Sequence, residues 1–594
     1  MPIVNADVAA VFREIADLLE VQGANTFRVR AYRNAARTLE ELGRSVKSMV
    51  ERGEDLDALP GFGPDLAGKV AEVVATGSCE QLRQLRKELP ATITELLALP
   101  GIGPKRVRAL YEALGIQTME QLLEAGRQGR IRELRGFGPT TESLILQSAT
   151  ERLSQDKRFR QSVAAQVADA LLAELKRVPG VHEAVAAGSL RRLRDTVGDL
   201  DLLVTTGART DVMGFFVRGP DVQRVISQGP TRSSVLLRNR LQVDLRAVPR
   251  PSFGAAWLYF TGSKAHNIAL RKLAQEAGLK LNEYGLYRGD KRIAGDTEAS
   301  VYAALGLDFI EPELREDRGE IEAAREGRLP RLVALKDLKG DLHCHTRESD
   351  GRDSLEDMAK AARERGLRYL AITEHSRRLA MARGLDAERL ARQIDRIEEL
   401  NAKQDGVVLL KGVEVDILED GSLDLPDSIL KRLDLVVAAV HHRFSEPREK
   451  QTARLLRAMD NPHFSILAHP TGRLIDERGP SDIDLQRVIR KARERGCFLE
   501  LNSQPDRLDL DDIACRMARD EGVLVSIASD AHGTLELDFL RSGVGQARRG
   551  WLRARDVLNT RTLDELRPLL DATMGRATAR RTAARKKVLA HGAA

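Results

Sequence analysis

The stretch AAGSLRRLRDTVGDLDLLV, residues 186–204, decides the fold of the front half of this chain. Its apolar second half predicts a strand, and the two-residue period of a strand places Asp199 and Asp201 on one face. Two carboxylates on one face raise each other's pKa unless a cation joins them. Asp244 lies in another apolar run and is expected to supply a third carboxylate from a neighbouring strand. We therefore predict a catalytic site in which these three residues hold two Mg²⁺ or Mn²⁺ ions for phosphoryl transfer.

The residues just before these carboxylates favour phosphate binding. A helix is predicted to end before Gly188, and Gly188 and Ser189 are expected to form a turn with exposed N–H donors, followed by Arg191 and Arg192. Two aspartates alone would be weak evidence, because strands often carry surface aspartates. Together with the turn, the arginines and the third aspartate, they predict a nucleotidyl-transfer site.

One pattern occurs three times in the mostly helical first 150 residues: LPGFGPDLAGKV at 59–70, LPGIGPKRVRAL at 99–110 and LRGFGPTTESLI at 134–145. In each copy Gly-x-Gly-Pro separates two helical segments. The glycines let the backbone approach a ligand closely, and the next helix begins with N–H groups that can bind phosphate. A single copy could be an ordinary tight turn, but three copies indicate DNA binding without base readout. The glycines concerned are Gly61, Gly63, Gly101, Gly103, Gly136 and Gly138.

Lys69 follows the first of these turns. A lysine with a lowered pKa could attack the aldehyde of an abasic sugar and form a Schiff base. A solvated or phosphate-contacting lysine is an equal alternative, and Asp65 nearby would stabilise the ammonium form. Both interpretations of Lys69 stay open.

Composition excludes several classes of protein. The chain has 594 residues, of which 42% are hydrophobic and 31% charged, so it is neither disordered nor fibrous. No apolar run reaches the ~20 residues of a membrane helix, and no signal peptide is expected at the N-terminus. The four cysteines form no CxxC pair, which agrees with a reducing cytoplasm. We expect a cytoplasmic monomer whose formal charge of +6 permits a polyanionic partner.

Metal chemistry of a second kind is predicted in the rear half. Eight of the 11 histidines lie between residues 341 and 532, where apolar runs alternate with helical segments as in a βα barrel. Six of the seven apolar runs end with His, Asp or Glu, and the carboxyl ends of barrel strands meet at one mouth. Imidazole mixed with carboxylate suits Zn²⁺, Mn²⁺ or Fe²⁺ better than Mg²⁺, and the donors fit two or three ions that hydrolyse phosphoesters. The predicted ligands are His343, His345, Asp350, His375, Glu414, His441, His469, Asp530 and His532, with Glu414 a natural bridge.

The motifs between residues 1 and 310 resemble the DNA polymerase X family, of which DNA polymerase beta is the best-known member. The resemblance implies that Asp199, Asp201 and Asp244 bind the metals, with Asp244 serving as the base for the primer 3′-hydroxyl or lying beside it. It also places Lys69 at the family's lyase position. The run WLYFTGSKAHNIALR (257–271) is similar to the family's nucleotide-binding segment. The dNTP-binding residues implied are Gly188, Ser189, Arg192, Gly198, Tyr259, Phe260, Gly262, Asn267 and Arg271.

The histidine pattern resembles the PHP (polymerase and histidinol phosphatase) superfamily, a (βα)₇ barrel with a trinuclear centre. A polymerase module followed by a PHP module is similar to the bacterial and archaeal PolX enzymes. This likeness implies DNA repair by template-directed gap filling, joined to a 3′→5′ exonuclease or 3′-end-processing activity and to abasic-site cleavage. The implied substrates are dNTPs and gapped or nicked DNA with a 5′-phosphate.

The predicted fold class is multidomain α/β. The domains expected are a helical DNA-binding domain at 1–85, a second helix-hairpin-helix domain at 86–150, a nucleotidyltransferase palm at 151–250, a thumb-like subdomain at 251–312, an exposed linker at 313–335, a PHP barrel at 336–575 and a basic tail at 576–594.

Two alternatives stay open. One is a small-molecule phosphoesterase fused to a nucleotidyltransferase, against which the three hairpins argue. The other is a DNA-end-binding protein in which only the PHP phosphoesterase is active. Such a protein would need gaps in the front carboxylate set, and the sequence has none.

Overall fold

The computed structural model describes residues 5–42, 46–59, 61–89, 93–97, 99, 102–154, 158–207, 210–403 and 406–576. Gly101 of the second hairpin and residues 577–594 of the predicted basic tail lie outside this part of the chain. The chain divides into two compact units: residues 1–159, 163–177 and 211–243 form one, and residues 160–162, 178–210 and 244–594 form the other.

Helices form the N-terminal region, as the sequence predicts. Helix α1 (Asn5–Val21) buries Val8, Phe12, Ile15 and Leu19, whose three- and four-residue spacing makes one apolar face. This helix packs against α2 (Thr26–Glu41) and α5 (Glu80–Glu88). The remaining elements are α3 (Val46–Glu51), η1 (Leu56–Ala58), α4 (Pro64–Thr76), α6 (Ile93–Leu97), α7 (Pro104–Leu114), α8 (Met119–Arg127) and α9 (Pro139–Ser154).

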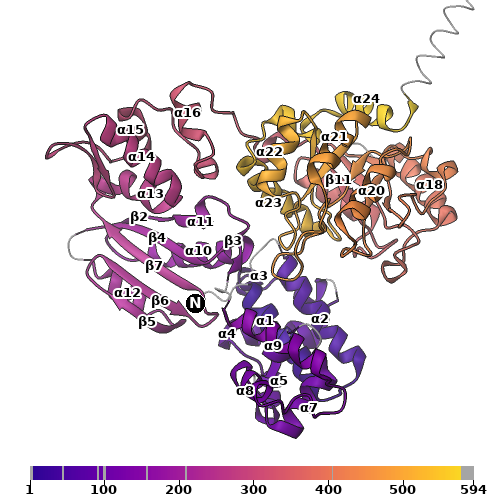
Figure 1. The fold of residues 1–594 in the computed structure, drawn as a ribbon, viewed down its shortest axis with the longest axis horizontal. Helices are drawn as coiled ribbons and strands as arrows, with labels where there is room; N and C mark the ends of the chain where they lie inside the picture. The colour runs from indigo at the N-terminus through magenta and orange to yellow at the C-terminus, as the bar shows by residue number, and fades with distance from the viewer. Residues whose placement is uncertain are drawn as a thin grey trace, which may run out of the picture. The chain divides into compact units, whose positions relative to one another are not determined.

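A five-stranded sheet follows, in the order β2-β4-β7-β6-β5 (Figure 1). The helix predicted to end before Gly188 is wrong, because residues 181–186 form β2 and pair antiparallel with β4. Alanine favours a helix, but pairing with β4 gives this edge strand backbone hydrogen bonds along one side. The elements are β1 (Phe159–Arg160), α10 (Gln161–Leu175), β2 (Val181–Ala186), α11 (Gly188–Arg191), β3 (Thr196–Val197), β4 (Asp199–Thr206), α12 (Val212–Val217), β5 (Val222–Gln228), β6 (Arg232–Leu237) and β7 (Gln242–Val248).

The charged stretch expected to be an exposed linker is structured instead. Leu314 and Ile321 are buried in an apolar core, and Arg315 is fully buried with its Nη1 2.6 Å from Glu298 Oε1. The many charged residues of this stretch suggest solvent exposure, but several of them form ion pairs with other parts of the protein. The elements here are η2 (Arg250–Ser252), α13 (Phe253–Thr261), α14 (Lys264–Glu276), β8 (Lys280–Asn282), β9 (Gly285–Arg288), β10 (Lys291–Ala294), α15 (Glu298–Ala304), η3 (Pro312–Leu314) and α16 (Glu320–Arg325).

Parallel strands form the core of the rear part, with helices around them (Figure 1). They are β11 (Gly340–Cys344), β12 (Tyr369–Ile372) and β13 (Val408–Lys411) in one sheet, and β14 (Glu414–Asp416), β15 (Val437–Ala439), β16 (Ile466–Leu467), β17 (Phe498–Asn502) and β18 (Val525–Ala528) in another. Parallel bridges His375–Glu414 and Cys344–Ala531 join the two sheets, in agreement with the predicted βα barrel.

Helices connect most successive strands of this part, as parallel pairing requires, while η4 precedes β11 and the helices after Ala528 follow the last strand. They are η4 (Leu335–Asp337), α17 (Leu355–Glu364), η5 (Ala380–Ala382), α18 (Ala387–Lys403), α19 (Asp427–Leu430), α20 (Arg448–Ala458), α21 (Leu485–Arg495), α22 (Asp512–Asp520), η6 (Thr534–Phe539), α23 (Leu540–Arg549), η7 (Ala554–Asp556), η8 (Leu558–Thr560) and α24 (Leu563–Thr573). Among the described residues, no helix combines the length and the apolar character needed to cross a membrane.

Candidate metal centres

The three predicted carboxylates lie on two adjacent strands. Asp199 and Asp201 alternate along β4, and Asp244 lies on β7, the neighbour of β4 in the sheet. Burial, and after it the charges of Asp199 and Asp244, raises the pKa of Asp201 to about 7. Negative charge is therefore crowded at this point of the sheet, and a divalent cation would relieve the repulsion.

Two of the predicted glycines border this group at positions that need glycine. Gly188 has a φ of 63°, and a Cβ on it would collide with Oδ2 of Asp201. Gly262 has a φ of 68°, and its Cβ would lie 3.2 Å from Nη1 of Arg192. Because side chains rarely adopt this backbone region, both positions favour a residue without one. Without side chains at these two positions, backbone groups stay accessible beside the aspartates and the arginine.

Arg192 is held by groups that sequence reasoning missed. Its Nε lies 3.1 Å from Oε1 of Glu316, and its Nη1 donates to the carbonyl of Thr261. Arg549 of α23 contacts the same Glu316 oxygen at 3.0 Å and donates to the Arg192 carbonyl at 2.7 Å. Burial alone would raise the pKa of Glu316, but Arg192 and Arg549 hold it below its usual range. No local signal marks Glu316, because it lies in a stretch of many charges.

The predicted aromatic pair lies on α13. The rings of Tyr259 and Phe260 meet edge to face with centroids 5.1 Å apart, and the Arg246 guanidinium lies 4.2 Å from the Phe260 centroid. Asn267 on α14 donates from Nδ2 to the Tyr259 carbonyl at 2.6 Å. The other predicted nucleotide-binding residues are Ser189 in α11, Gly198 between β3 and β4, and Arg271, whose Nε donates to the Asn267 carbonyl at 3.3 Å.

Each hairpin glycine pair directly precedes a helix. Gly63 and Gly103 are the N-cap residues of α4 and α7, and neither helix has a side-chain cap at that end. Gly138 stands just before α9, while Gly61 and Gly136 have positive φ values of 77° and 90°. Uncapped N–H groups at a helix start are suited to phosphate. The described glycines therefore have the geometry that the sequence predicts.

Lys69 lies on α4, and its Nζ pairs with the carboxylate of Asp65. Burial lowers the pKa of Lys69, but the hydrogen bond and charge of Asp65 outweigh it and leave the pKa raised. A raised pKa keeps the amine protonated, so this geometry favours the phosphate-contacting interpretation over the nucleophile.

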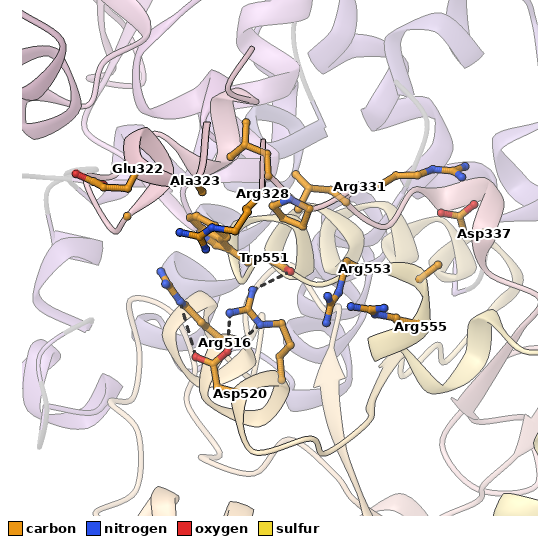
Figure 2. A pocket seen from close by; sticks show the side chains of 16 residues that line it. Glu322, Ala323, Arg328, Arg331, Asp337, Arg516, Asp520, Trp551, Arg553 and Arg555 are labelled. Atoms are coloured by element: carbon orange, nitrogen blue, oxygen red, sulfur yellow. Dashed lines mark hydrogen bonds and ion pairs between the residues drawn. The ribbon is translucent and has the colours of Figure 1, made fainter. Parts of the chain in front are cut away.

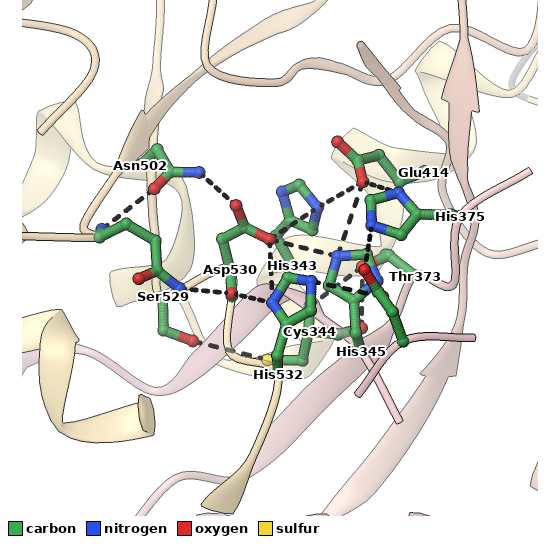
Figure 3. A network of polar contacts seen from close by, with 12 residues as sticks. His343, Cys344, His345, Thr373, His375, Glu414, Asn502, Ser529, Asp530 and His532 are labelled. Carbon is green, nitrogen blue, oxygen red and sulfur yellow. Dashed lines mark hydrogen bonds and ion pairs between the residues drawn. The ribbon is translucent and has the colours of Figure 1, made fainter. Parts of the chain in front are cut away.

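The histidine-bearing strand ends meet in one buried cluster (Figure 3). Glu414 lies at its centre, with Oε2 2.6 Å from Nδ1 of His375, and Oε1 3.0 Å from Nε2 of His469 and 3.2 Å from Nε2 of His441. Three sets of donor atoms lie close enough to hold an ion each: His345, Asp350, His375 and His532; His343, His345 and Asp530; and His375, Glu414 and His441.

Several donor atoms of the cluster are buried without a hydrogen-bond partner among the described residues. They include Nε2 of His343, both ring nitrogens of His345 and Oδ1 of Asp530. Burial, followed by the charges of His532 and His375, lowers the pKa of His345 to about 3, so its ring is neutral. A metal ligand must be deprotonated, and orphaned buried donors that converge fit cations.

A second layer of carboxylates orients the histidines, and the sequence did not reveal it. Glu500 on β17 lies 2.6 Å from Nδ1 of His343, and Asp416 on β14 lies 3.2 Å from Nδ1 of His441. Such partners fix the ring orientation and leave the other ring nitrogen for a metal. The signal that could have found Glu500 is a single acid inside the apolar run CFLELNS (497–503).

Family models match four parts of the chain. They are a helix-hairpin-helix domain at residues 3–79, a SAM-like helix-hairpin-helix tandem at 93–151, a DNA polymerase beta thumb at 256–316 and a PHP domain at 341–504. A curated relative from Bacillus subtilis (strain 168), named DNA polymerase/3′-5′ exonuclease PolX, is 38% identical over 571 residues, which cover 95% of this chain and 99% of the relative. The chain belongs to the PolX family.

The rear part of this PolX family member is also similar to proteins named probable phosphatase. One from Thermoanaerobacter sp. (strain X514) is 30% identical over 231 residues, 37% of this chain and 89% of that protein. Another, from Caldanaerobacter subterraneus subsp. tengcongensis, is 32% identical over 203 residues, 32% of this chain and 75% of that protein. Asp530 and His532 lie beyond the matched PHP range, yet both belong to the cluster.

Proposed function

We propose that this chain is a DNA repair polymerase that fills short gaps by template-directed synthesis and trims 3′ ends with a separate metal-dependent nuclease. The identity to the PolX relative along nearly the whole chain supports both activities. The observation that carries the proposal is the presence of two donor sets of different chemistry. The front set consists of carboxylates alone, and the rear set mixes imidazole with carboxylate.

The residues on hand fit the implied metals. Asp199, Asp201 and Asp244 would hold two Mg²⁺ or Mn²⁺ ions, and the rear cluster would hold two or three Mn²⁺, Zn²⁺ or Fe²⁺ ions. Bound ions supply charge neutralisation at phosphate and an acidified water or hydroxyl. Asp244 accepts the proton of the primer 3′-hydroxyl. Gly188, Arg192 and Gly262 border the place of the triphosphate.

The substrates proposed are dNTPs and gapped or nicked DNA with a 5′-phosphate. Three hairpins, each before a helix start, support contact with the DNA backbone. Abasic-site cleavage belongs to the rear centre in this proposal. We further propose a monomer with the domain limits expected from the sequence, except that residues 313–335 belong to folded structure. Light scattering and limited proteolysis test these two points.

A gapped, 5′-phosphorylated duplex with a labelled primer tests the function. With dNTPs and Mn²⁺, the parent chain should both lengthen and shorten the primer. Asp199→Ala/Asp201→Ala should abolish lengthening and leave shortening, and His343→Ala/His345→Ala should do the reverse. Loss of direct ligands should lower each rate at least ~100-fold, since even outer-shell changes cost 10–100-fold at metal sites.

Two exposed residues outside both centres provide matched controls. Asp290→Ala and His182→Ala remove the same side-chain types and should alter neither rate. If both activities survive both double variants, the site assignment is wrong. If His343→Ala/His345→Ala lowers only the hydrolysis of a small ester such as p-nitrophenyl phosphate, the rear centre is a phosphatase and not a nuclease.

A further inference from the structure

An arginine-rich cleft lies away from both candidate metal centres. It has a volume of about 1050 Å³ and is formed by residues 319–332 together with residues 516–520 and 551–555 of the rear part (Figure 2). A β-bridge between Leu332 and Arg553 joins the two walls. Clefts of roughly 300–1,000 Å³ are typical of sites that enclose a ligand.

Positive charge dominates the lining. Six arginines face three acidic residues in the lining, and two of these arginines, Arg328 and Arg553, pair with Glu326 and Asp556 just outside it. Two of the acids already have local partners: Asp520 pairs with Arg519, and Asp337 accepts a hydrogen bond from the Ala334 N–H. The arginines of the lining are Arg328, Arg331, Arg516, Arg519, Arg553 and Arg555.

The arginines fall into a fixed group and an available group. Arg516 lies over the Trp551 ring at 4.6 Å and donates to the Arg318 carbonyl at 2.9 Å, while Arg519 donates to the Trp551 carbonyl at 3.2 Å. These contacts hold two guanidinium groups in place, and Asp520, which pairs with both, offsets one of their two charges. Arg331 and Arg555 are exposed and make no side-chain hydrogen bond or ion pair with any residue that the structure describes.

We propose that this cleft, residues 319–332, 516–520 and 551–555, binds the phosphate backbone of a DNA strand. The inference rests on the proposed function, which makes DNA the polyanion that this chain handles. Guanidinium groups bind phosphate through paired N–H donors, and fixed arginines beside free ones provide both a preformed seat and adaptable contacts. Because the lining offers no carboxylate cluster or histidine, the cleft is an anchoring site without chemistry of its own.

The position of the cleft in the barrel separates it from the nuclease centre. Asp520 ends α22, which leads into the beginning of β18 at Val525. Asp530 and His532 of the metal cluster follow the other end of the same strand. The cleft therefore holds a part of the DNA that is distant from the bond being cleaved. Its loss should weaken binding and leave the rate of either reaction unchanged once DNA is saturating.

The salt dependence of DNA binding tests the proposal. We compare the full chain with Arg331→Ala/Arg555→Ala, using a labelled single strand and fluorescence anisotropy between 0.1 and 1 M salt. Each lost phosphate contact lowers the magnitude of the slope of log K against log salt by about 0.7, so two lost contacts lower it by about 1.4. If the parent chain and the variant bind equally at 1 M salt, the variant should therefore bind about 25-fold more weakly at 0.1 M salt.

Arg392→Ala/Arg567→Ala is the matched control, because both side chains are exposed, lie outside the cleft and make no side-chain hydrogen bond or ion pair with the described residues. The control should change the slope of log K against log salt by less than half of the change that the cleft variant causes. Equal slopes in the parent chain and the cleft variant, or equal losses in both variants, would overturn the proposal.

A crosslinking experiment tests the location independently of affinity. The native cysteines are all buried, so a thiol introduced by Glu322→Cys in the cleft can be labelled selectively with a benzophenone maleimide. Illumination should join this residue to DNA, whereas the same label at Arg567→Cys should give no more than background. Tripolyphosphate is tested as a competitor. If it binds the cleft tightly while DNA fails to crosslink, the site takes a free polyphosphate and the proposal is wrong.

Neither measurement depends on catalysis. An inactive chain that still crosslinks at residue 322 would refute the proposed function but support DNA binding in the cleft. An active chain that does not crosslink would support the proposed function but refute DNA binding in the cleft.

Discussion

If Arg192 binds the incoming triphosphate, as we propose, Glu316 competes for the same guanidinium group, and Glu316→Gln should tighten dNTP binding. In the structure one carboxylate oxygen of Glu316 accepts from Nε of Arg192 at 3.1 Å and from Nη1 of Arg549 at 3.0 Å. The side chains of Glu316 and Arg192 are only 12% and 14% exposed, so water screens the pair weakly. A triphosphate that uses Arg192 must first displace this carboxylate.

The magnitude follows from the single bond that is weakened. A hydrogen bond to a charged group contributes about 1.5–3 kcal/mol, and a neutral one about 0.5–1.5 kcal/mol. Glutamine keeps the shape of Glu316 and can still accept from Arg192, so the substitution weakens the competing bond by about 1 kcal/mol. The Kd for dNTP should fall about fivefold. The free energy of unfolding should fall by about 2 kcal/mol, because Arg549 also loses one of its two charged acceptors and keeps only Asp512.

The Kd is measured by dNTP titration of a gapped duplex that carries a dideoxy-terminated primer, and stability is measured by urea unfolding. Glu313→Gln is the matched control. Glu313 is similarly buried and pairs with Arg548 at 2.7 Å, but none of its hydrogen bonds or ion pairs involves Arg192. An unchanged or weaker dNTP affinity in Glu316→Gln, or equal tightening in Glu313→Gln, would refute the competition.

Three further predictions concern single residues. Glu414→Gln should lower the metal content of the purified protein, measured by mass spectrometry, and stop 3′ trimming while primer extension continues, because Glu414 contacts five of the clustered histidines. Gly188→Ala should stop extension without unfolding the protein, since a Cβ there collides with Asp201 and a positive φ adds strain of about 1–3 kcal/mol; a normal extension rate would contradict the placement of this turn. Asp65→Asn should lower the pKa of Lys69, because Asp65, together with Tyr32, raises it. Borohydride trapping of abasic DNA should nevertheless stay unchanged, because Lys69 is expected to contact phosphate, and increased trapping with a lower pH midpoint would instead identify Lys69 as the nucleophile.

The elements that the sequence predicts well are those with a short-range signal. The two-residue alternation around Asp199 and Asp201 requires only that the segment be a strand, and β4 has that geometry. The Gly-x-Gly-Pro pattern places helix starts at Pro64, Pro104 and Pro139 for reasons confined to a few neighbouring residues. In these places local preference and the tertiary fold agree.

The features that the sequence hides depend on partners distant in the chain. Residues 181–186 have helical composition, but β4 recruits them as a strand. Glu316 belongs to a stretch that resembles a solvated linker, and only the fold brings it between Arg192 and Arg549. Glu500 looks like an interruption of an apolar run until His343 is placed beside it. Each of these residues acts through a contact that no local pattern specifies.

The two metal centres differ in a way that follows from their surroundings. In the front site carboxylates lie on strands with one exposed member, Asp199, so water and substrate phosphates can complete the shell of a hard ion. In the rear site most donors are buried, with Asp350 and His532 partly exposed, and Glu414, the neutral His345 and their partners would supply most of the shell themselves. Imidazole mixed with carboxylate suits Zn²⁺, Mn²⁺ or Fe²⁺, whereas carboxylate oxygens alone suit Mg²⁺ or Mn²⁺. Under the proposed function, the donor sets and not the shared DNA substrate would therefore determine which ions each centre uses.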